Sequence, residues 1–175
     1  MGLDMYLRCN SKALTEKMHE GAPYGDYITD YYMRTGVVVY WRKANAIHKW
    51  LVDHVQDGND DCGTYEVSYE TLFELMTICE CILEECPLEE EPSDTSSGKI
   101  GNVERAMELL PTAQGFFFGS TEYDAYYFAD VEWTAKQLRK LLNGVRRCDN
   151  GLGGFYIAAN TEPDWEVKFT YHSSW

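Results

Sequence analysis

The apolar residues between Leu72 and Cys86 recur with the period of an α-helix. They fall on one helical face, formed by Leu72, Leu75, Met76, Cys79, Ile82, Leu83 and Cys86. A helix with one continuous apolar face must bury it against another layer of structure. Ser68 precedes this helix as its expected N-cap. A second long helix is predicted after Thr121, with Asp124 completing a variant of the capping box. Its apolar face consists of Tyr127, Val131, Thr134, Leu138 and Leu141.

Other stretches have the signature of β-strands. Residues 2–8 alternate between apolar and polar side chains, which is the period of a strand with one solvated face. Residues 36–41 and 115–120 each begin with a glycine and are rich in β-branched or aromatic side chains, so each predicts a strand. Near the C-terminus, residues 155–159 and 165–171 are predicted to pair as a hairpin. Strands at both ends with helices between them predict an α+β fold, a mostly antiparallel sheet packed with three main helices.

Two segments lack a clear period. Residues 10–30 are polar and acidic and are expected to form a loop with at most one helical turn, and Arg146 and Arg147 are expected in a second loop. Residues 87–102 are acidic and rich in Pro, Ser and Gly, which predicts a flexible insertion. Because 175 residues suffice for one core, we expect a single domain over residues 1–175 that carries this insertion, with a short helix at 103–110 after it.

The charge of the chain narrows the classes of partner. A net charge of −14 disfavours direct binding of nucleic acid, which requires a surplus of Lys and Arg. No apolar run approaches the ~20 residues of a bilayer span, and the first residues are not a hydrophobic leader. We therefore expect a cytoplasmic protein without a membrane partner, whose six cysteines are reduced. No pattern indicates an oligomeric state, a metal or a cofactor.

Residues 40–50 break a local rule. The helix predicted over about residues 42–55 opens with Arg42 and Lys43, although helices favour acidic residues in the first turn, and it lacks a Ser, Thr, Asp or Asn cap. Residues 31–52 contain four cations and no acidic residue in an otherwise acidic chain. This basic island therefore requires an anion, either from the same chain or from a ligand.

Two interpretations of this island remain open. In the first, its cations form internal salt bridges with Glu122, Asp124, Asp60 or Asp61. In the second, the first turn binds an anionic small molecule such as a nucleotide, on whose organic part Trp41 or Tyr126 stacks. The candidate ligand-binding residues are those of the two helix starts, Trp41, Arg42, Lys43, Asn45 and His48 together with Thr121, Glu122, Asp124 and Tyr126.

Other classes of function have weaker signals. His48 as a general base and Cys62 as a nucleophile would make the chain an enzyme, but no third residue is marked to orient them. The adjacent Asp60 and Asp61 also disfavour a thiolate at Cys62.

Hydrolysis by Glu122, Asp124 and His48 around a metal is another alternative, but these residues lack a recognisable ligand spacing. An acidic surface that mimics nucleic acid and blocks a host protein is a further alternative, although much of its charge lies in the insertion. We therefore expect a binding protein rather than an enzyme.

Several motifs resemble one family. The stretches MGLDMYL at 1–7, YWRKANAIHKW at 40–50, DDCG at 60–63, LP at 110–111, GFFFGSTEYD at 115–124 and YHSSW at 171–175 are similar to small uncharacterised phage and prophage proteins. The resemblance touches the whole chain except for residues 9–30 and 84–102. It implies a phage protein in the host cytoplasm, an accessory factor that binds a host protein or sequesters a host signal. It implies no particular chemistry.

Overall fold

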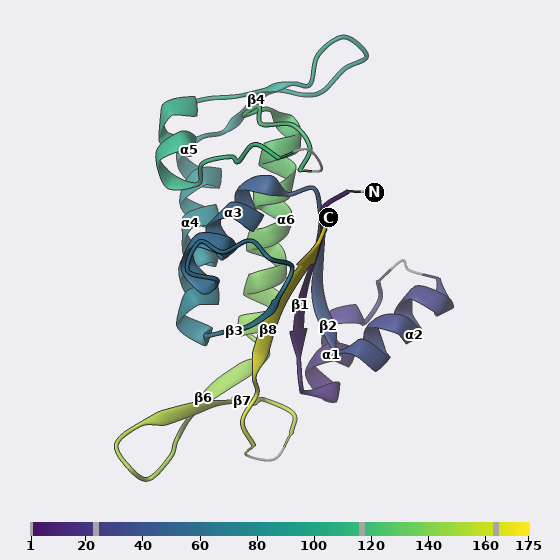
Figure 1. Cartoon of the computed structure of the whole chain (residues 1–175), viewed down its shortest axis with the longest axis vertical. Helices are drawn as coiled ribbons and strands as arrows, with labels where there is room; N and C mark the ends of the chain where they lie inside the picture. The colour runs from purple at the N-terminus through teal and green to yellow at the C-terminus, as the bar shows by residue number, and fades with distance from the viewer. Residues whose placement is uncertain (1, 23–24, 116–117, 163–164) are drawn as a thin grey trace.

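A four-stranded antiparallel sheet brings the two ends of the chain together. The computed structural model describes residues 2–22, 25–115, 118–162 and 165–175. In the sheet, β1 (Asp4–Cys9) lies between β2 (Val37–Arg42) and β8 (Phe169–Ser174), and β3 (Thr64–Val67) pairs with the other edge of β8. The two termini therefore lie next to each other at one end of the sheet (Figure 1).

Three helices form the layer that covers one side of this sheet. They are α3 (Asn45–Val55), α4 (Tyr69–Glu85) and α6 (Ala125–Leu142), and α4 packs along α6 (Figure 1). The apolar side chains of β1 face this layer, since Met5 and Leu7 are fully buried, as is Leu3 directly before the strand. The apolar faces predicted for the two long helices are likewise buried, apart from Leu83, which is partly exposed. The α+β fold and its three main helices are confirmed.

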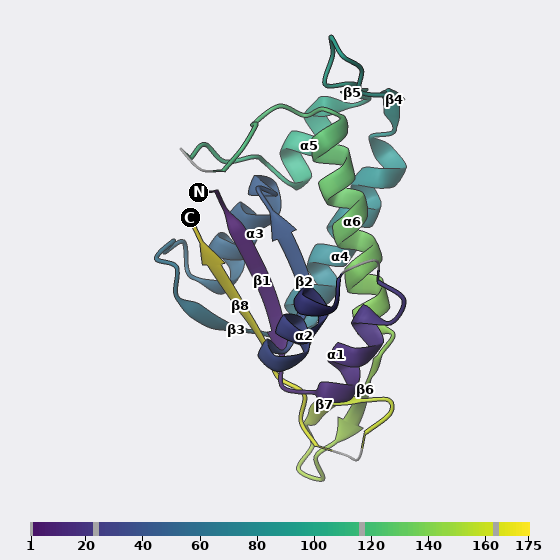
Figure 2. The same cartoon turned by 90° about the vertical axis from the view of Figure 1, so that its right-hand side faces the viewer.

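Two further helices occupy the region that was expected to be a loop. They are α1 (Lys12–His19) and α2 (Asp26–Thr35), which lie near β2 (Figure 2). The prediction of a loop at residues 10–30 is therefore wrong. Ser11 caps α1 by accepting the backbone N–H of Leu14 at 3.1 Å. The apolar pattern of the sequence did not indicate these helices, because few of their residues are buried and their apolar faces are therefore short.

The C-terminal strands pair differently from the expectation. β7 (Phe155–Ala159) pairs with β6 (Val145–Asp149) in a hairpin that projects from the body (Figure 1). Arg146 and Arg147 consequently lie in a strand and not in a loop. The expected hairpin of 155–159 with 165–171 is wrong, because β8 joins the central sheet and buries Phe169 and Tyr171 there. A local alternation identifies a strand but does not choose its partner.

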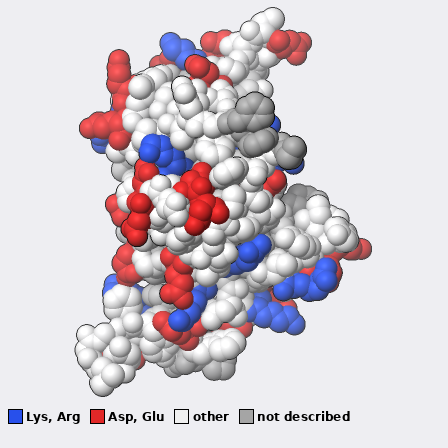
Figure 3. All heavy atoms as spheres, in the orientation of Figure 1, with Lys and Arg blue, Asp and Glu red and all other residues white. Residues whose placement is uncertain are grey.

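The acidic insertion contains a second short hairpin. β4 (Leu88–Glu90) pairs with β5 (Lys99–Ile100), and α5 (Val103–Leu109) follows as expected. Acidic side chains are spread over much of the face in Figure 3, with Lys and Arg among them. Of the strand expected at 115–120, residues 116–117 lie outside the described residues, and residues 115 and 118–120 are not in a strand. No helix in the described part of the chain combines the length and apolar character of a membrane span.

Candidate functional site

The basic pair Arg42 and Lys43 forms the turn between β2 and α3. Arg42 is the last residue of β2, Lys43 has a left-handed backbone with φ of 60°, and α3 begins only at Asn45. The expected helix start at residue 42 is therefore wrong. The N–H of Lys43 donates to the carbonyl of Leu3 at 2.8 Å, so pairing with the N-terminal strand continues to this point and ends in a turn. The two cations thus stand directly before the helix.

The first turn of α3 has no side-chain cap, as the sequence predicts. Ala44 occupies the N-cap position and offers no acceptor. The N–H of Asn45 donates to the carbonyl of Lys43 at 2.9 Å, whereas those of Ala46 and Ile47 have no acceptor among the described residues. Both of these residues are buried. Free N–H groups at the positive end of a helix dipole favour an anion at this position.

Asn45 connects this turn to the segment between α5 and α6. Its amide nitrogen donates to the carbonyl of Ser120 and, at 3.4 Å, to that of Phe118. Its Oδ1 accepts the backbone N–H of Ala113 at 3.3 Å. Because the side chain is 4% exposed and both of its polar atoms are used, Asn45 positions the segment over the start of α3. We assign it a role in shaping the site.

The start of α6 is capped by Asp124 and not by Thr121. Oδ1 of Asp124 accepts the N–H groups of Tyr126 at 3.0 Å and Tyr127 at 3.1 Å. The carbonyl of Thr121 instead accepts the hydroxyl of Thr112 at 3.0 Å. Thr and Asp are both good N-caps, so the local sequence did not distinguish between two positions three residues apart. The helix accordingly begins one turn later than expected.

A cavity of about 390 Å³ lies between these two helix starts. One wall consists of Arg42, Lys43 and the first residues of α3, and the other of the segment before α6 and the first turns of α6. Six of the nine candidate residues line it, namely Arg42, Lys43, Asn45, Glu122, Asp124 and Tyr126. Tyr126 is 62% exposed, so its ring is accessible beside the cavity. The volume is in the range of small-molecule sites.

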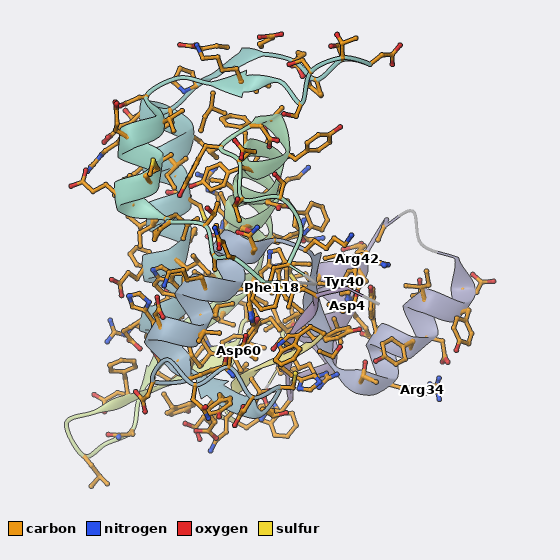
Figure 4. The ribbon with its side chains drawn as sticks, turned by 45° about the horizontal axis from the view of Figure 1, so that its top comes forward. Asp4, Arg34, Tyr40, Arg42, Asp60 and Phe118 are labelled. Carbon is orange, nitrogen blue, oxygen red and sulfur yellow. The ribbon has the colours of Figure 1, made fainter. Side chains whose placement is uncertain are left out.

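The cations of this cavity have no counter-ion within the described part of the chain. Arg42 and Lys43 are exposed, and neither makes an ion pair or a side-chain hydrogen bond with another described residue. Arg42 lies opposite Asp4 in the β1–β2 ladder, close to Tyr40 (Figure 4). Asp4, however, accepts the hydroxyl of Tyr40 at 2.5 Å. Neither cation is therefore neutralised by an ion pair with a described residue, and the guanidinium of Arg42 lies beside Gly2 and near Tyr40.

Of the four carboxylates that might have paired with these cations, three have other partners, and the fourth, Glu122, lines the cavity without forming an ion pair. Asp124 caps α6. Asp60 accepts from His48 at 3.0 Å and from Trp175 at 3.2 Å. Asp61 accepts the N–H of Gly63 at 2.8 Å. Glu122 is exposed and makes no ion pair with a described residue. The internal salt bridges of the first interpretation are thus not formed among the described residues.

The remaining candidate residues, Trp41, His48 and Thr121, do not line the cavity. Trp41 is buried, and its Nε1 donates to Oγ1 of Thr134 on α6 at 2.8 Å. His48 is 1% exposed and lies between the Tyr171 hydroxyl, 2.7 Å from Nδ1, and Asp60 at Nε2. Trp41 and His48 therefore belong to the core. The hypothesis of His48 as a general base requires an access to solvent that the buried ring lacks.

Asp130 lines the cavity and was missed by the sequence analysis. Asp130 is partly buried, and its carboxyl group makes no hydrogen bond or ion pair with a described residue. Burial and the nearby charge of Asp124 raise the pKa of Asp130 from 3.8 to about 7. A signal was present: Asp130 lies three residues after Tyr127 and four before Thr134, so it places an acidic group on the apolar face of α6.

Comparisons with known proteins offer no analogy. No protein-family model matches the chain, and neither a curated protein nor a solved structure is detectably similar to it. The function is therefore argued from the cavity itself.

Proposed function

We propose that the chain binds a small anionic molecule in the cavity between α3 and α6, without transforming it. The observation that carries this proposal is that Arg42, Lys43, Ala46 and Ile47 line one cavity, while the two cations have no anionic partner and the N–H groups of Ala46 and Ile47 have no acceptor among the described residues. Cations at an uncapped helix start are the arrangement that proteins use for phosphate.

Nucleotides are the first class of ligand to test. A phosphate group suits the cationic wall, and the accessible ring of Tyr126 provides a surface on which a base can stack. The resemblance to small phage proteins supports a role in an infected cell, where such binding would sequester a host signal molecule. That role is part of the proposal, and it requires the ligand binding that the thermal-shift experiment below measures.

A thermal-shift panel of nucleoside mono-, di- and triphosphates and inorganic phosphate tests the proposal. A ligand at a hundred times its Kd adds about 2.7 kcal/mol of stability, which corresponds to about 5–10 °C in Tm for a chain of this size. Arg42→Ala should remove the shift while leaving the Tm of the free protein nearly unchanged, because the side chain is exposed.

Arg34→Ala is the matched control. Arg34 is also exposed, but it lies on α2 apart from Arg42 (Figure 4), does not line the cavity, and pairs with Asp30 at 2.9 Å. This variant should retain the full ligand-induced shift, because it removes the same charge from a different place. If no anion raises the Tm, or if the Arg42 variant responds like the unmodified protein, the proposal is wrong.

A further inference from the structure

The wall opposite the cations carries three carboxyl groups, those of Glu122, Asp124 and Asp130. None of them makes an ion pair with a described residue. A ligand that is anionic throughout would meet these like charges as soon as Arg42 and Lys43 drew it into the cavity. The cavity therefore favours an anionic group beside Arg42 and Lys43 and disfavours one beside the three carboxyl groups.

Asp130 is the carboxyl group for which a partner matters most. Asp124 already accepts two backbone N–H groups, and Glu122 is exposed, whereas Asp130 is partly buried in the wall of the cavity without a described partner. An ionised carboxylate in such a place costs free energy unless a cation or a donor compensates it. A positively charged group of a bound ligand would supply that compensation.

Resting on the proposed function, we propose that the ligand is a zwitterion, whose anionic group faces Arg42 and Lys43 and whose protonated amine faces Asp130. One small molecule then meets opposite charges on opposite walls of the cavity. A metal ion is a poorer occupant of the acidic wall, because no three metal-ligating side chains of the described residues are grouped to hold one. The amine makes the ligand class narrower than that of nucleotides in general.

A ladder of aminoalkyl phosphates, from aminoethyl to aminohexyl phosphate, tests this inference against alkyl phosphates of matching length. Dissociation constants are measured by calorimetry or by NMR titration at about pH 8, where Asp130 is ionised. At one or more lengths the amine should tighten binding about tenfold, as expected for a charge-assisted hydrogen bond. Several lengths are used because the experiment also determines which distance between the phosphate and the amine fits the cavity best.

Asp130→Asn should abolish the preference for the amine and leave the binding of alkyl phosphates intact. Glu132→Gln is the matched control, since it removes an exposed carboxylate of the same helix outside the cavity, and it should keep the preference. Asp130→Ala serves as a second variant if the amide disturbs folding.

The outcomes separate this inference from the proposed function. Alkyl phosphates that bind as tightly as their amino counterparts at every length would overturn the zwitterion and leave the anion site standing. An amine preference that persists in both Asp130 variants would also overturn it. If neither series binds, and nucleotides also fail to raise the Tm, the proposed function itself is wrong.

Discussion

Replacing Asp130 by Asn should stabilise the protein at neutral and alkaline pH and leave its stability at acidic pH unchanged. The folded protein holds the pKa of Asp130 at about 7, against 3.8 for an unperturbed carboxyl. Between these values the folded chain binds a proton that the unfolded chain has lost. The contribution of this group to stability is thus fully present below about pH 4 and is lost as the pH rises through about 7.

The size of the effect follows from the same two values. At about 1.4 kcal/mol for each pH unit between them, the upper limit is about 4 kcal/mol. Because the side chain is only partly buried and lines the cavity, about half of this is a reasonable expectation. The Asn variant should then exceed the unmodified protein by about 2 kcal/mol at pH 8, or about 4–8 °C in Tm.

Urea denaturation followed by tryptophan fluorescence, across about pH 4–8, measures the difference between the two proteins. Titration of the other carboxyl groups cancels in this difference, because both proteins share them. Glu132→Gln is the control, since its carboxylate is exposed and its effect on stability should vary little with pH. A difference between unmodified and Asn variants that is independent of pH would refute the burial argument for Asp130.

Three further substitutions probe the framework of the site. Thr134→Val removes the acceptor of the buried Trp41 N–H and should cost about 1–3 kcal/mol in urea denaturation, whereas Thr77→Val, on the exposed side of α4, should cost much less. Asp124→Ala leaves two N–H groups of α6 uncapped and should cost about 0.5–2 kcal/mol; a neutral result would contradict its capping role. Leu75→Ala empties part of the core and should cost about 2–5 kcal/mol, measured by the same denaturation, so a cost below 1 kcal/mol would contradict its full burial.

Local periodicity was a reliable guide to the elements of the core. The faces of α4 and α6 and the buried side of β1 follow directly from the spacing of Leu72, Val131 and Met5 with their neighbours. The prediction failed where the signal was short or depended on a distant partner. Helices α1 and α2 bury few residues, and the strand at 169–174 finds its partners at β1 and β3, far away in the sequence.

In the candidate site, too, the local features could be predicted from the sequence and the long-range ones could not. The uncapped, cation-preceded start of α3 was visible in the sequence, because capping depends on residues within one turn. The position of this start was not visible, because β2 extends through Arg42 and α3 begins at Asn45 instead of the predicted residue 42. Asp130 falls between Tyr127 and Thr134 on the predicted apolar face, so its position could be read from the sequence, whereas the cavity that it lines could not.

The sequence by itself determined the class of fold, the buried faces of the long elements and the anomaly at residues 40–50, because these depend on the spacing of neighbouring side chains. Only the tertiary structure decided which strands pair, that Asp4, Asp60 and Asp124 have partners other than Arg42 and Lys43, and that Asp130 faces the cavity. Pairing, neutralisation and desolvation arise between residues that are distant in the chain, so they exist only after the chain has folded.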